Sequence, residues 1–598
     1  MSASSIFDDM GGRFVARLRE HRDVIHTLKG VRGEGISLRG RVGILEAKFD
    51  LGVLDRLHRP CFVAIERTLG DYTDRGEQVN GLAYLVYEVT RVNPTHFQML
   101  AINAALPTVV RKEYLETIYG GWGISDETWV DVQCAPTGYM MWVDKGKPVF
   151  SQSVLLPLAG APAHMLSKEA TKAFLCVEQG VPIGKILGFD VDLTVDIENL
   201  IKYHAGVFGF TGTGKSNLTS QLIRSSLNAL GESIVVVFDV AGEYAVNLAD
   251  ILSAQGLFYS TENIDDVESF LRSQTLPETL ESRVNHSHLE KWADGLLSDG
   301  RVRRLQVGKD DIQLTIGFLL DHLDSYVKEK KTGGLQALAL YNHILSVARK
   351  NKIGLDTPLT ELPADVKNEV LDLVENTRKS LNDRSALYGE LGTIKDSLSL
   401  LQAEIEGSEA LWCTPKKLAH EVVSNDASPL IIVYTPDPVE ARKACSSFIG
   451  ELLYVKKHGY MKRVTVVLDE AQEFIPYEPH KEDLTADSSL AVEALLRQGR
   501  KYRAHCVLAT QRVARLNTNA LQQLHSYFVS TMPRSYDRGV VAEAFSLNYE
   551  VIERTTELDT GQWLFVSFKS TKQRNVPVFI NTPNNEDRVV EWFNIFYG

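Results

Sequence analysis

The strongest constraint on the fold is a glycine-rich stretch, GFTGTGKS, which runs from Gly209 to Ser216. The apolar run AGVFG (205–209) precedes it, and the helix-like stretch SNLTSQLIRSSLNAL follows. A glycine-rich turn between a strand and a helix lets backbone N–H groups surround phosphate oxygens, and the helix start faces the same anion. In such a loop the lysine carries charge to the β- and γ-phosphates, and the serine hydroxyl ligates Mg²⁺. The sequence therefore predicts a binding site for ATP and Mg²⁺.

We expect the nucleotide to contact a short continuous segment at this loop. Its predicted contacts are Gly209, Thr211, Gly212, Thr213, Gly214, Lys215, Ser216 and Asn217. Lys215 is also expected to act in catalysis, and Ser216 to be a metal ligand.

Several short apolar runs predict the sheet around this loop. They are SIVVVFD (233–239), LIIVY (430–434), VTVVLD (464–469), HCVLAT (505–510) and SYFVST (526–531). Runs of this type are typical of strands buried on both faces. Their alternation with helix-like segments predicts an α/β fold with a mostly parallel sheet.

Polar residues follow two of these runs and are candidates for catalysis. Asp469 and Glu470 stand at the end of VTVVLD, where an α/β sheet places its ligand site. Asp469 is expected to hold Mg²⁺, and Glu470 to polarise the attacking water as a general base. Gln511 follows HCVLAT and has both a donor and an acceptor with which to contact the γ-phosphate or orient the water. Without the phosphate loop, the Asp469–Glu470 pair and Gln511 would be ordinary polar residues at strand ends.

The basic segment RQGRKYR (497–503) precedes HCVLAT. An arginine fork can neutralise the charge that spreads over a transferring phosphoryl group, and ring ATPases often supply it from the neighbouring subunit. Arg500 is the preferred candidate over Arg497. The alternative is a basic helix end that satisfies its last carbonyl groups.

The chain is expected to contain several domains around the ATPase core. Short strands with turn residues between them predict a β-barrel over 1–190. Core segments are expected at 191–255 and 425–580, with a helical insertion over 256–424 and a short C-terminal segment over 581–598. Within the insertion, Lys328, Lys330 and Lys331 form a candidate DNA-contacting loop, although a solvated charge run is the simpler and preferred interpretation.

Composition limits the cellular setting and the partners. The net charge of −13 argues against a surface evenly coated for DNA or anionic lipid, but it allows a local basic channel. The six cysteines are scattered without a CxxC pair, as expected in a reducing compartment. The chain shows neither a signal peptide nor an apolar run of membrane-spanning length. We therefore expect a cytoplasmic protein.

With these residues in view, the sequence resembles the HerA family, relatives of the FtsK DNA translocases. The resemblance rests on GFTGTGKS, FDVAGEY (238–244), LDEAQEFIP (468–476), RQGRKY (497–502) and LATQR (508–512). It implies that Asp239 and Glu243 lie beside the nucleotide site or at a subunit interface. It also implies a homohexameric ring with double-stranded DNA in its pore and a nuclease or a sirtuin-like NADase as effector partner, docked on the β-barrel face.

The chain departs from the family pattern at two places. Position 203 is Tyr, where many relatives have a basic residue, and Tyr477–Ser489 lengthens the stretch between Glu470 and Arg500. Three functions stay open: a DNA-translocating motor, an ATP-controlled scaffold that assembles an effector, and a monomeric ATPase. Repair and anti-phage defence are both compatible with the sequence.

Overall fold

The structure is a computed structural model, and it forms two compact units, residues 1–302 with 419–598 and residues 303–418. The residues that it describes are 6–29, 35–67, 82–93, 107–121, 129–307, 316–317, 319–320, 323–324, 334–351, 353–354, 362–381, 387–388, 391 and 412–598.

The first unit begins with an antiparallel barrel. Its strands are β1 (Ala16–Lys29), β2 (Gly35–Lys48), β3 (Phe62–Arg67), β4 (Ala83–Asn93), β5 (Trp129–Asp144), β6 (Lys147–Gln152) and β7 (Pro162–Met165). They follow the order β2-β1-β7-β3-β4-β5-β6, and a further β2–β5 pairing closes the first six into a barrel. Closure removes the free edges that an open sheet would expose.

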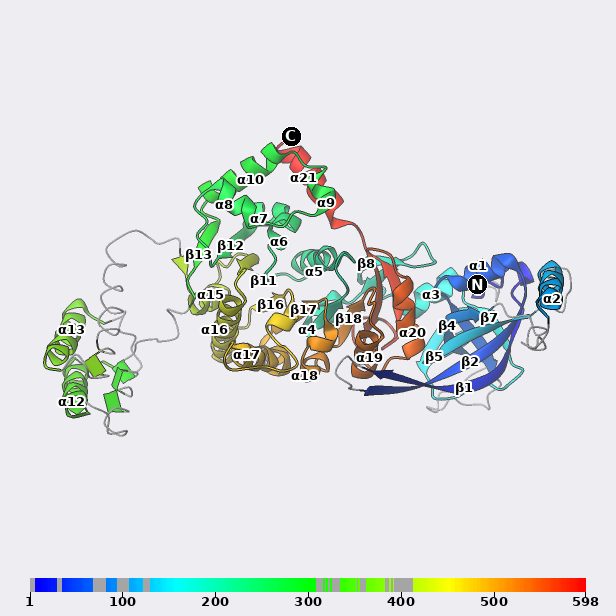
Figure 1. Ribbon diagram of the computed structural model, residues 1–598, viewed down its shortest axis with the longest axis horizontal. Helices are drawn as coiled ribbons and strands as arrows, with labels where there is room; N and C mark the ends of the chain where they lie inside the picture. Colours follow the sequence, from blue (N-terminus) through cyan, green and yellow to red (C-terminus); the bar gives the residue numbers. More distant parts are fainter. Residues whose placement is uncertain are drawn as a thin grey trace. The chain divides into compact units, whose positions relative to one another are not determined.

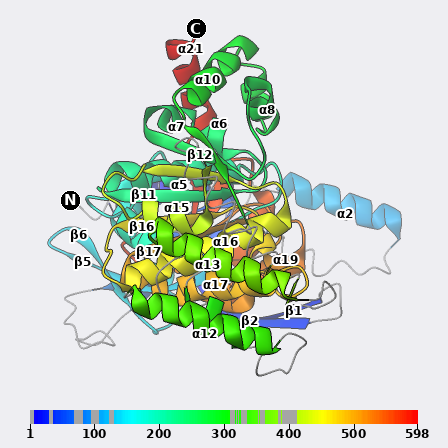
Figure 2. The same ribbon diagram turned by 90° about the vertical axis from the view of Figure 1, so that its left-hand side faces the viewer.

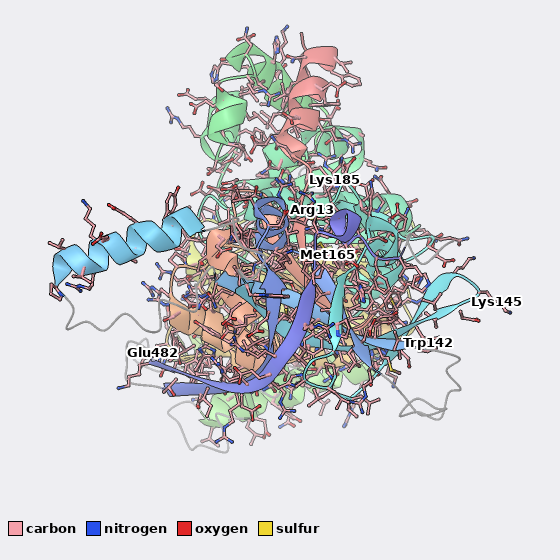
Figure 3. All side chains as sticks on the ribbon, turned by 90° about the vertical axis from the view of Figure 1, so that its right-hand side faces the viewer. Arg13, Trp142, Lys145, Met165, Lys185 and Glu482 are labelled. Carbon is pink, nitrogen blue, oxygen red and sulfur yellow. The ribbon has the colours of Figure 1, made fainter. Side chains whose placement is uncertain are left out.

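Successive side chains along the barrel strands point alternately to the barrel interior and to its outer face. Leu85, Tyr87 and Val89 of β4 pack in the barrel interior, whereas Val86 belongs to the large cluster that continues into the rest of the unit. The tight turn between β5 and β6 has two left-handed residues, Lys145 and Gly146, as a two-residue hairpin loop requires. Figure 3 shows Lys145 at the tip of this hairpin, which points away from the barrel.

The second part of the unit is built on a large sheet. Its strands are β8 (Val181–Ile186), β9 (Asp192–Val195), β10 (Ala205–Phe208), β11 (Ser233–Asp239), β12 (Gly256–Ser260), β15 (Leu430–Tyr434), β16 (Arg463–Leu468), β17 (Ala504–Thr510), β18 (Ser526–Val529), β19 (Gln562–Ser567) and β20 (Val578–Asn581). Within this unit the order is β12-β15-β11-β16-β17-β10-β18-β19-β20-β8-β9. The pairings from β12 to β18 are parallel, and those from β18 to β9 are antiparallel. The predicted α/β fold with a mostly parallel sheet is confirmed.

Helices cover both faces of the parallel strands. The principal ones are α5 (Lys215–Ala229), α16 (Pro438–Lys457) and α17 (Thr485–Gln498), and Figure 1 shows α5 on one side of the sheet with α16 and α17 on the other. The start of α16 is fixed by its sequence, because Asp437 accepts hydrogen bonds from the N–H groups of Val439 and Glu440 and Pro438 opens the helix.

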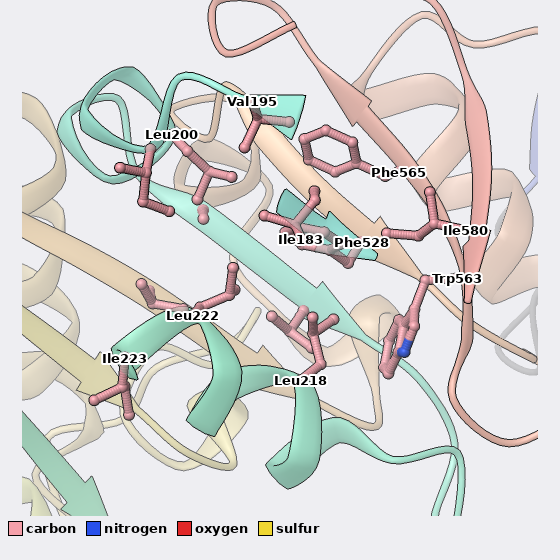
Figure 4. Packing of buried hydrophobic residues seen from close by; sticks show 14 of the residues in the cluster. Ile183, Val195, Leu200, Leu218, Leu222, Ile223, Phe528, Trp563, Phe565 and Ile580 are labelled. Carbon is pink, nitrogen blue, oxygen red and sulfur yellow. The ribbon is translucent and has the colours of Figure 1, made fainter. Parts of the chain in front are cut away.

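The core beneath the phosphate loop is apolar and fully buried. Leu218 and Leu222 of α5 share one cluster with Phe528, Trp563 and Phe565 from the strands (Figure 4). Burying side chains of this size contributes about 1.5–3 kcal/mol each. This packing fixes the direction of α5, and with it the loop at its start.

The boundaries of the parts differ in detail from those expected. The chain enters the large sheet at β8, before residue 190. The strand β12 of that sheet and the short strands β13 (Val302–Leu305) and β14 (Trp412–Cys413) lie inside the expected insertion of 256–424. The acidic stretch 262–300 also packs on the main core, through the buried side chains of Phe270 and Trp292. Strands as short as these carry too few residues for an alternation pattern to be recognised.

Between residues 316 and 391 the second unit is helical where the structure describes it. Its long helices are α12 (Gly334–Lys350) and α13 (Ala364–Lys379), shown in green in Figure 2, and they share one buried apolar cluster. Lys328, Lys330 and Lys331 lie outside the described residues. Across the described residues of the chain, no helix has both the length and the apolar character needed to cross a bilayer.

Candidate nucleotide site

The glycine-rich loop follows β10, which lies between β17 and β18 in the middle of the sheet. Gly212 and Gly214 have φ values of 81° and 92°, which side chains with a Cβ atom rarely adopt. At Gly209 a Cβ atom would lie 2.6 Å from Thr213 Oγ1. The first residue of α5 is Lys215, so the loop ends where the helix presents its free N–H groups. The local geometry is that of an anion-binding loop.

Contacts from the end of the chain hold the loop in place. Thr560 Oγ1 donates to the Gly212 carbonyl at 3.1 Å, and Gly561 N donates to the Thr213 carbonyl at 3.0 Å. Asn217 Nδ2 donates to the Pro583 carbonyl at 2.9 Å, and Asn217 Oδ1 accepts from Asn585 N at 2.7 Å. Asn217 therefore ties the C-terminal segment to the start of α5. Sequence patterns missed these partners, because contacts across more than 300 residues leave no local signal.

Lys215, Glu470 and Gln511 meet at the carboxyl end of the parallel strands. Lys215 Nζ lies 3.1 Å from Glu470 Oε1, and the Lys215 side chain is 8% exposed. Gln511 Nε2 donates to the same carboxylate oxygen, and Thr211 Oγ1 of the loop donates to Gln511 Oε1. The structure thus brings together the predicted lysine, general base and γ-phosphate contact, and it links them to the loop.

Gln472, which the sequence patterns missed, completes this network together with Thr510. Gln472 Nε2 donates to Glu470 Oε2 at 2.9 Å, and Gln472 Oε1 accepts a hydrogen bond from Thr510. Both Glu470 oxygens are therefore held by side-chain donors. A weak signal was available, since Gln472 follows the Asp469–Glu470 pair by two residues.

The backbone and the charge of Glu470 are both unusual. Its φ of 47° places a residue with a Cβ atom in the left-handed region, at a cost on the order of 1 kcal/mol or more. Burial alone would raise the pKa of Glu470, but the Lys215 ammonium and hydrogen bonds from Gln472 and Gln511 hold it below its ordinary value. The carboxylate is therefore ionised at neutral pH, as a base must be.

The residues expected to hold Mg²⁺ present oxygen donors of the type that this ion prefers. The Ser216 hydroxyl donates to Glu243 Oε2, and the Tyr244 hydroxyl donates to Asp469 Oδ1 at 3.4 Å. Burial raises the pKa of Asp469 to about 8, opposed by the Lys215 charge and supported by the neighbouring carboxylates of Asp239, Glu243 and Glu470. Carboxylates crowded in this way favour a cation.

No group of three or more His, Cys, Asp or Glu side chains among the described residues forms a ready-made metal cage. Mg²⁺ is usually bound by one or two protein ligands and the phosphates of its nucleotide. Ser216 and Asp469 would hold the ion, with Glu243 beside them.

Asp239 organises the segment that carries Glu243. Its carboxylate accepts hydrogen bonds from the N–H groups of Gly242, Glu243 and Tyr244, at 2.8–3.2 Å. Gly242 has a φ of 74°, and a Cβ atom there would lie 2.2 Å from the Ser273 carbonyl oxygen. The DVAGEY spacing thus forms a tight turn that aims Glu243 at Ser216 and Tyr244 at Asp469.

Arg500 lies away from the phosphate loop of its own chain. It belongs to the 3-10 helix η6 (Gly499–Tyr502) at the amino end of β17, whereas Gln511 follows the carboxyl end. A seven-residue strand separates the two by roughly 20 Å. Arg497 pairs with Glu493 within α17 at 3.4 Å, which leaves Arg500 as the stronger candidate. A role for Arg500 at a neighbouring subunit stays a prediction.

The arrangement can hydrolyse a phosphoanhydride. Bound ATP–Mg²⁺ supplies the electrophilic phosphorus and part of the charge neutralisation. The loop N–H groups and Lys215 would bind the phosphate oxygens, and Gln511 connects the loop to Glu470 by hydrogen bonds. Glu470 would accept a proton from the attacking water.

Similarities to known proteins agree with this geometry. Residues 181–401 match the family profile described as the central domain of helicase HerA. The DNA double-strand break repair helicase HerA of Sulfurisphaera tokodaii is 23% identical over 426 residues, which are 70% of this chain and 72% of the relative. The corresponding helicase of Sulfolobus acidocaldarius is 23% identical over 427 residues, with the same shares of the two chains.

Among solved structures, VirB4 of Thermoanaerobacter pseudethanolicus aligns with a TM-score of 0.38 and 15% identity, over 69% of this chain and 99% of that one. The nucleotide-site geometry, the matched central domain and the two relatives together show a P-loop ATPase that is similar to the HerA helicases.

Proposed function

We propose that this ATPase is the subunit of a homohexameric DNA translocase that hydrolyses ATP to move double-stranded DNA through a central pore for a partner nuclease or defence effector. The observation that carries the proposal is the contact between Thr211 of the loop, Gln511 and Glu470. It links the nucleotide loop to the catalytic base through the tip of an adjacent strand, as a motor that senses the γ-phosphate requires. The HerA relatives are named for DNA double-strand break repair, which supports DNA as the substrate.

The test is the response of ATP hydrolysis to double-stranded DNA. We expect DNA to raise the turnover number, and the stimulation to weaken as salt increases, because phosphate contacts release counterions. Lys215→Ala should abolish hydrolysis with and without DNA, which controls for a contaminating ATPase. Hydrolysis by a hexamer that ignores DNA at low salt would contradict translocation but not the ATPase.

A second candidate function is an ATP-controlled scaffold, which a groove on the barrel favours. The groove has a volume of about 570 Å³ and lies between the β1–β2 strands and residues 153–156. Ile25 and Val154 line it and are 61% and 87% exposed. Apolar side chains this exposed around a concavity are typical of protein interaction sites. We assign this face of the barrel to effector docking.

Two kinds of variant distinguish the scaffold function from the motor function. Ile25→Asp combined with Val154→Asp should reduce effector copurification, measured as the mass of the complex, without changing basal ATP hydrolysis. Lys215→Ala and Glu470→Gln should stop hydrolysis. If the complex assembled from either ATPase-dead chain keeps full effector activity, turnover is dispensable and the scaffold function holds.

A further inference from the structure

Three aromatic rings gather at the amino ends of the parallel strands, opposite the phosphate loop. Tyr203 ends helix α4 (Ile197–Lys202) just before β10, His525 precedes β18, and Phe568 follows the antiparallel strand β19. The ring centroids of Tyr203 and His525 are 5.1 Å apart, and those of His525 and Phe568 are 6.0 Å apart. Phe568 is 44% exposed. The rings therefore form a short surface row.

Cations surround this row. The Arg500 guanidinium carbon lies 5.2 Å from the centre of the Tyr203 ring, and the Lys202 and Lys569 nitrogens lie 5.8 and 5.9 Å from it. Lys569 also lies 5.9 Å from the centre of the Phe568 ring. We call the six residues the basic-aromatic cluster: Lys202, Tyr203, Arg500, His525, Phe568 and Lys569.

The cations of the cluster lack the carboxylate partners that Arg224 and Arg463 of the same unit have. Arg224 pairs with Asp250 and Arg463 with Glu198, at 2.7 and 2.6 Å. Within the residues that the structure describes, Lys202, Arg500 and Lys569 make neither an ion pair nor a side-chain hydrogen bond. Like charges held together without counter-charges repel one another. In a chain of net charge −13, such a group indicates an anionic ligand.

Aromatic faces explain how the cations are held. A ring attracts a cation through its quadrupole and leaves the N–H donors of that cation free, whereas a carboxylate would occupy them. Tyr203 thus keeps Arg500 and Lys569 together and available. Phosphate oxygens, which Arg and Lys bind well, match this arrangement.

The anionic ligand of the cluster cannot be the nucleotide bound by the same chain. The cluster lies at the amino ends of the parallel strands, and the nucleotide site lies at their carboxyl ends. That site nevertheless needs more positive charge. Among the described residues, Lys215 is the one cation in contact with the catalytic network, and it is paired with Glu470. Charge that spreads over the transferring phosphoryl group is commonly neutralised by a further cation from another protein chain.

We propose that Lys569 and Arg500 of one copy contact the phosphates of ATP bound to a neighbouring copy, with Tyr203 as the residue that positions both cations. This proposal rests on the ring of the proposed function. Its new content is a second cation acting between subunits, Lys569, which lies outside every recognised motif, and a positioning role for the tyrosine that departs from the family pattern. The site is incomplete without the partner copy.

The test begins with homo-oligomers of single variants. Lys569→Gln should lower the turnover number for ATP about tenfold, whereas Lys569→Arg should keep most of it, because charge rather than shape is required. Tyr203→Leu should resemble Lys569→Gln, and Tyr203→Phe should restore activity because the ring remains. Lys572→Ala is the matched control, since Lys572 is in the same segment but lies 3.8 Å from Glu178. Oligomer mass and thermal unfolding are measured for each variant.

Mixed oligomers then test whether Lys569 acts on ATP bound to a neighbouring subunit. Lys215→Ala subunits keep an intact cluster, and Lys569→Gln subunits keep an intact phosphate loop. After subunit exchange, the mixture should hydrolyse ATP severalfold faster than the sum of the separate variants. No gain, with exchange confirmed by mass, overturns action between subunits.

Other outcomes also overturn the proposal, and they are distinguishable from failure of the motor function. Normal turnover by Lys569→Gln oligomers overturns it while the ATPase and the ring stand. If Lys569→Gln loses only DNA affinity and DNA stimulation at unchanged basal turnover, the cluster binds DNA instead. A monomeric wild-type chain with full ATP hydrolysis overturns both the ring and the cluster's role, and its mass shows this directly.

Discussion

At the residue scale, Glu470 shows how much of the site depends on one carboxylate. Lys215 and Gln511 contact one of its oxygens, Gln472 contacts the other, and the residue has a strained backbone. Strain that neighbouring contacts maintain is typical of functional positions. We predict that Glu470→Gln keeps ATP binding and lowers the turnover number about 10²–10⁴-fold, because an amide cannot accept the proton of the attacking water. Steady-state hydrolysis and equilibrium binding of a fluorescent ATP analogue measure the two effects.

The control for Glu470→Gln is Glu290→Gln, which makes the same change on the exposed surface of α10 (His286–Ser298). It should leave both quantities unchanged. Loss of ATP binding by Glu470→Gln, in parallel with loss of turnover, would mean that the carboxylate organises the loop rather than the reaction.

Gln511 joins Thr211 of the phosphate loop to Glu470 through its amide. Gln511→Ala removes both hydrogen bonds, so the loop no longer communicates with the base. We expect the turnover number to fall at least tenfold while the KM for ATP changes less than threefold, because the contact matters more in the transition state than in binding. A rise in KM at constant turnover would assign Gln511 to binding alone.

The predictability of these residues follows from the length of chain over which each contact forms. Lys215, Ser216, Asp469, Glu470 and Gln511 could be predicted because each stands at the end of a recognisable strand or loop. Thr560 and Asn585 could not, since they reach the loop from the far end of the chain and occupy no local pattern.

At the element scale, some strands could be predicted from a local sequence pattern and others could not. The runs SIVVVFD and LIIVY were predictable because they are apolar throughout and buried on both faces. β12 and β13 were not, because five and four residues with polar neighbours do not establish a period. The closure of the barrel by β2 and β5 was predictable only as a class, since strand pairing across almost a hundred residues depends on tertiary packing.

One set of elements links the nucleotide site to the barrel. After Gln511 the chain forms the short 3-10 helix η7 (Val513–Arg515), and Ala514 N donates to Asp537 Oδ1 of α19 (Ser535–Ala544) at 3.3 Å. On its other side α19 faces the β1–β2 strands, where a Cβ atom at Gly539 would lie 2.5 Å from Leu28. Asp537 therefore fixes the segment that follows Gln511.

We predict that Asp537→Ala lowers the turnover number about fivefold with little change in KM, because loss of one hydrogen bond costs about 1 kcal/mol of positioning. Asp537→Asn keeps an acceptor oxygen and should retain most activity. Hydrogen exchange of residues 511–517 should increase in Asp537→Ala only. Equal losses in the Ala and Asn variants would indicate that the charge of Asp537, not its hydrogen bond, is what matters.

At the scale of the whole molecule, two features concern charge: the balance over the whole chain, and the joint between the barrel and the ATPase core. The chain carries a net charge of −13, whereas the basic-aromatic cluster concentrates unpaired cations in one place. The joint itself contains a buried arginine. Arg554 donates to the Val89 and His58 carbonyls of the barrel at 2.7 and 3.0 Å.

Glu88 lies in the same joint and is 2% exposed. Burial raises the pKa of Glu88 to about 8, and the charge of Arg554 opposes the rise only in part. In the unfolded chain the pKa is about 4.5, so the folded state binds this proton more tightly and stability falls as pH rises from about 4.5 to about 8. The slope is at most about 1.4 kcal/mol per pH unit, and above about pH 8 the loss is complete.

We therefore predict that Glu88→Gln, which keeps the shape of the side chain and removes its ionisation, unfolds at a higher temperature than the wild type at pH 8.5. Below about pH 4.5 the two curves should converge, because Glu88 is then protonated in both the folded and the unfolded chain. Thermal unfolding across pH 4.5–8.5 measures the difference. Glu46→Gln is the control, because Glu46 is a half-exposed barrel carboxylate paired with Arg19 at 3.3 Å, where an ion pair contributes little. A constant difference between wild type and Glu88→Gln at every pH would show that Glu88 is ionised in the folded protein, and that Arg554 compensates its charge fully.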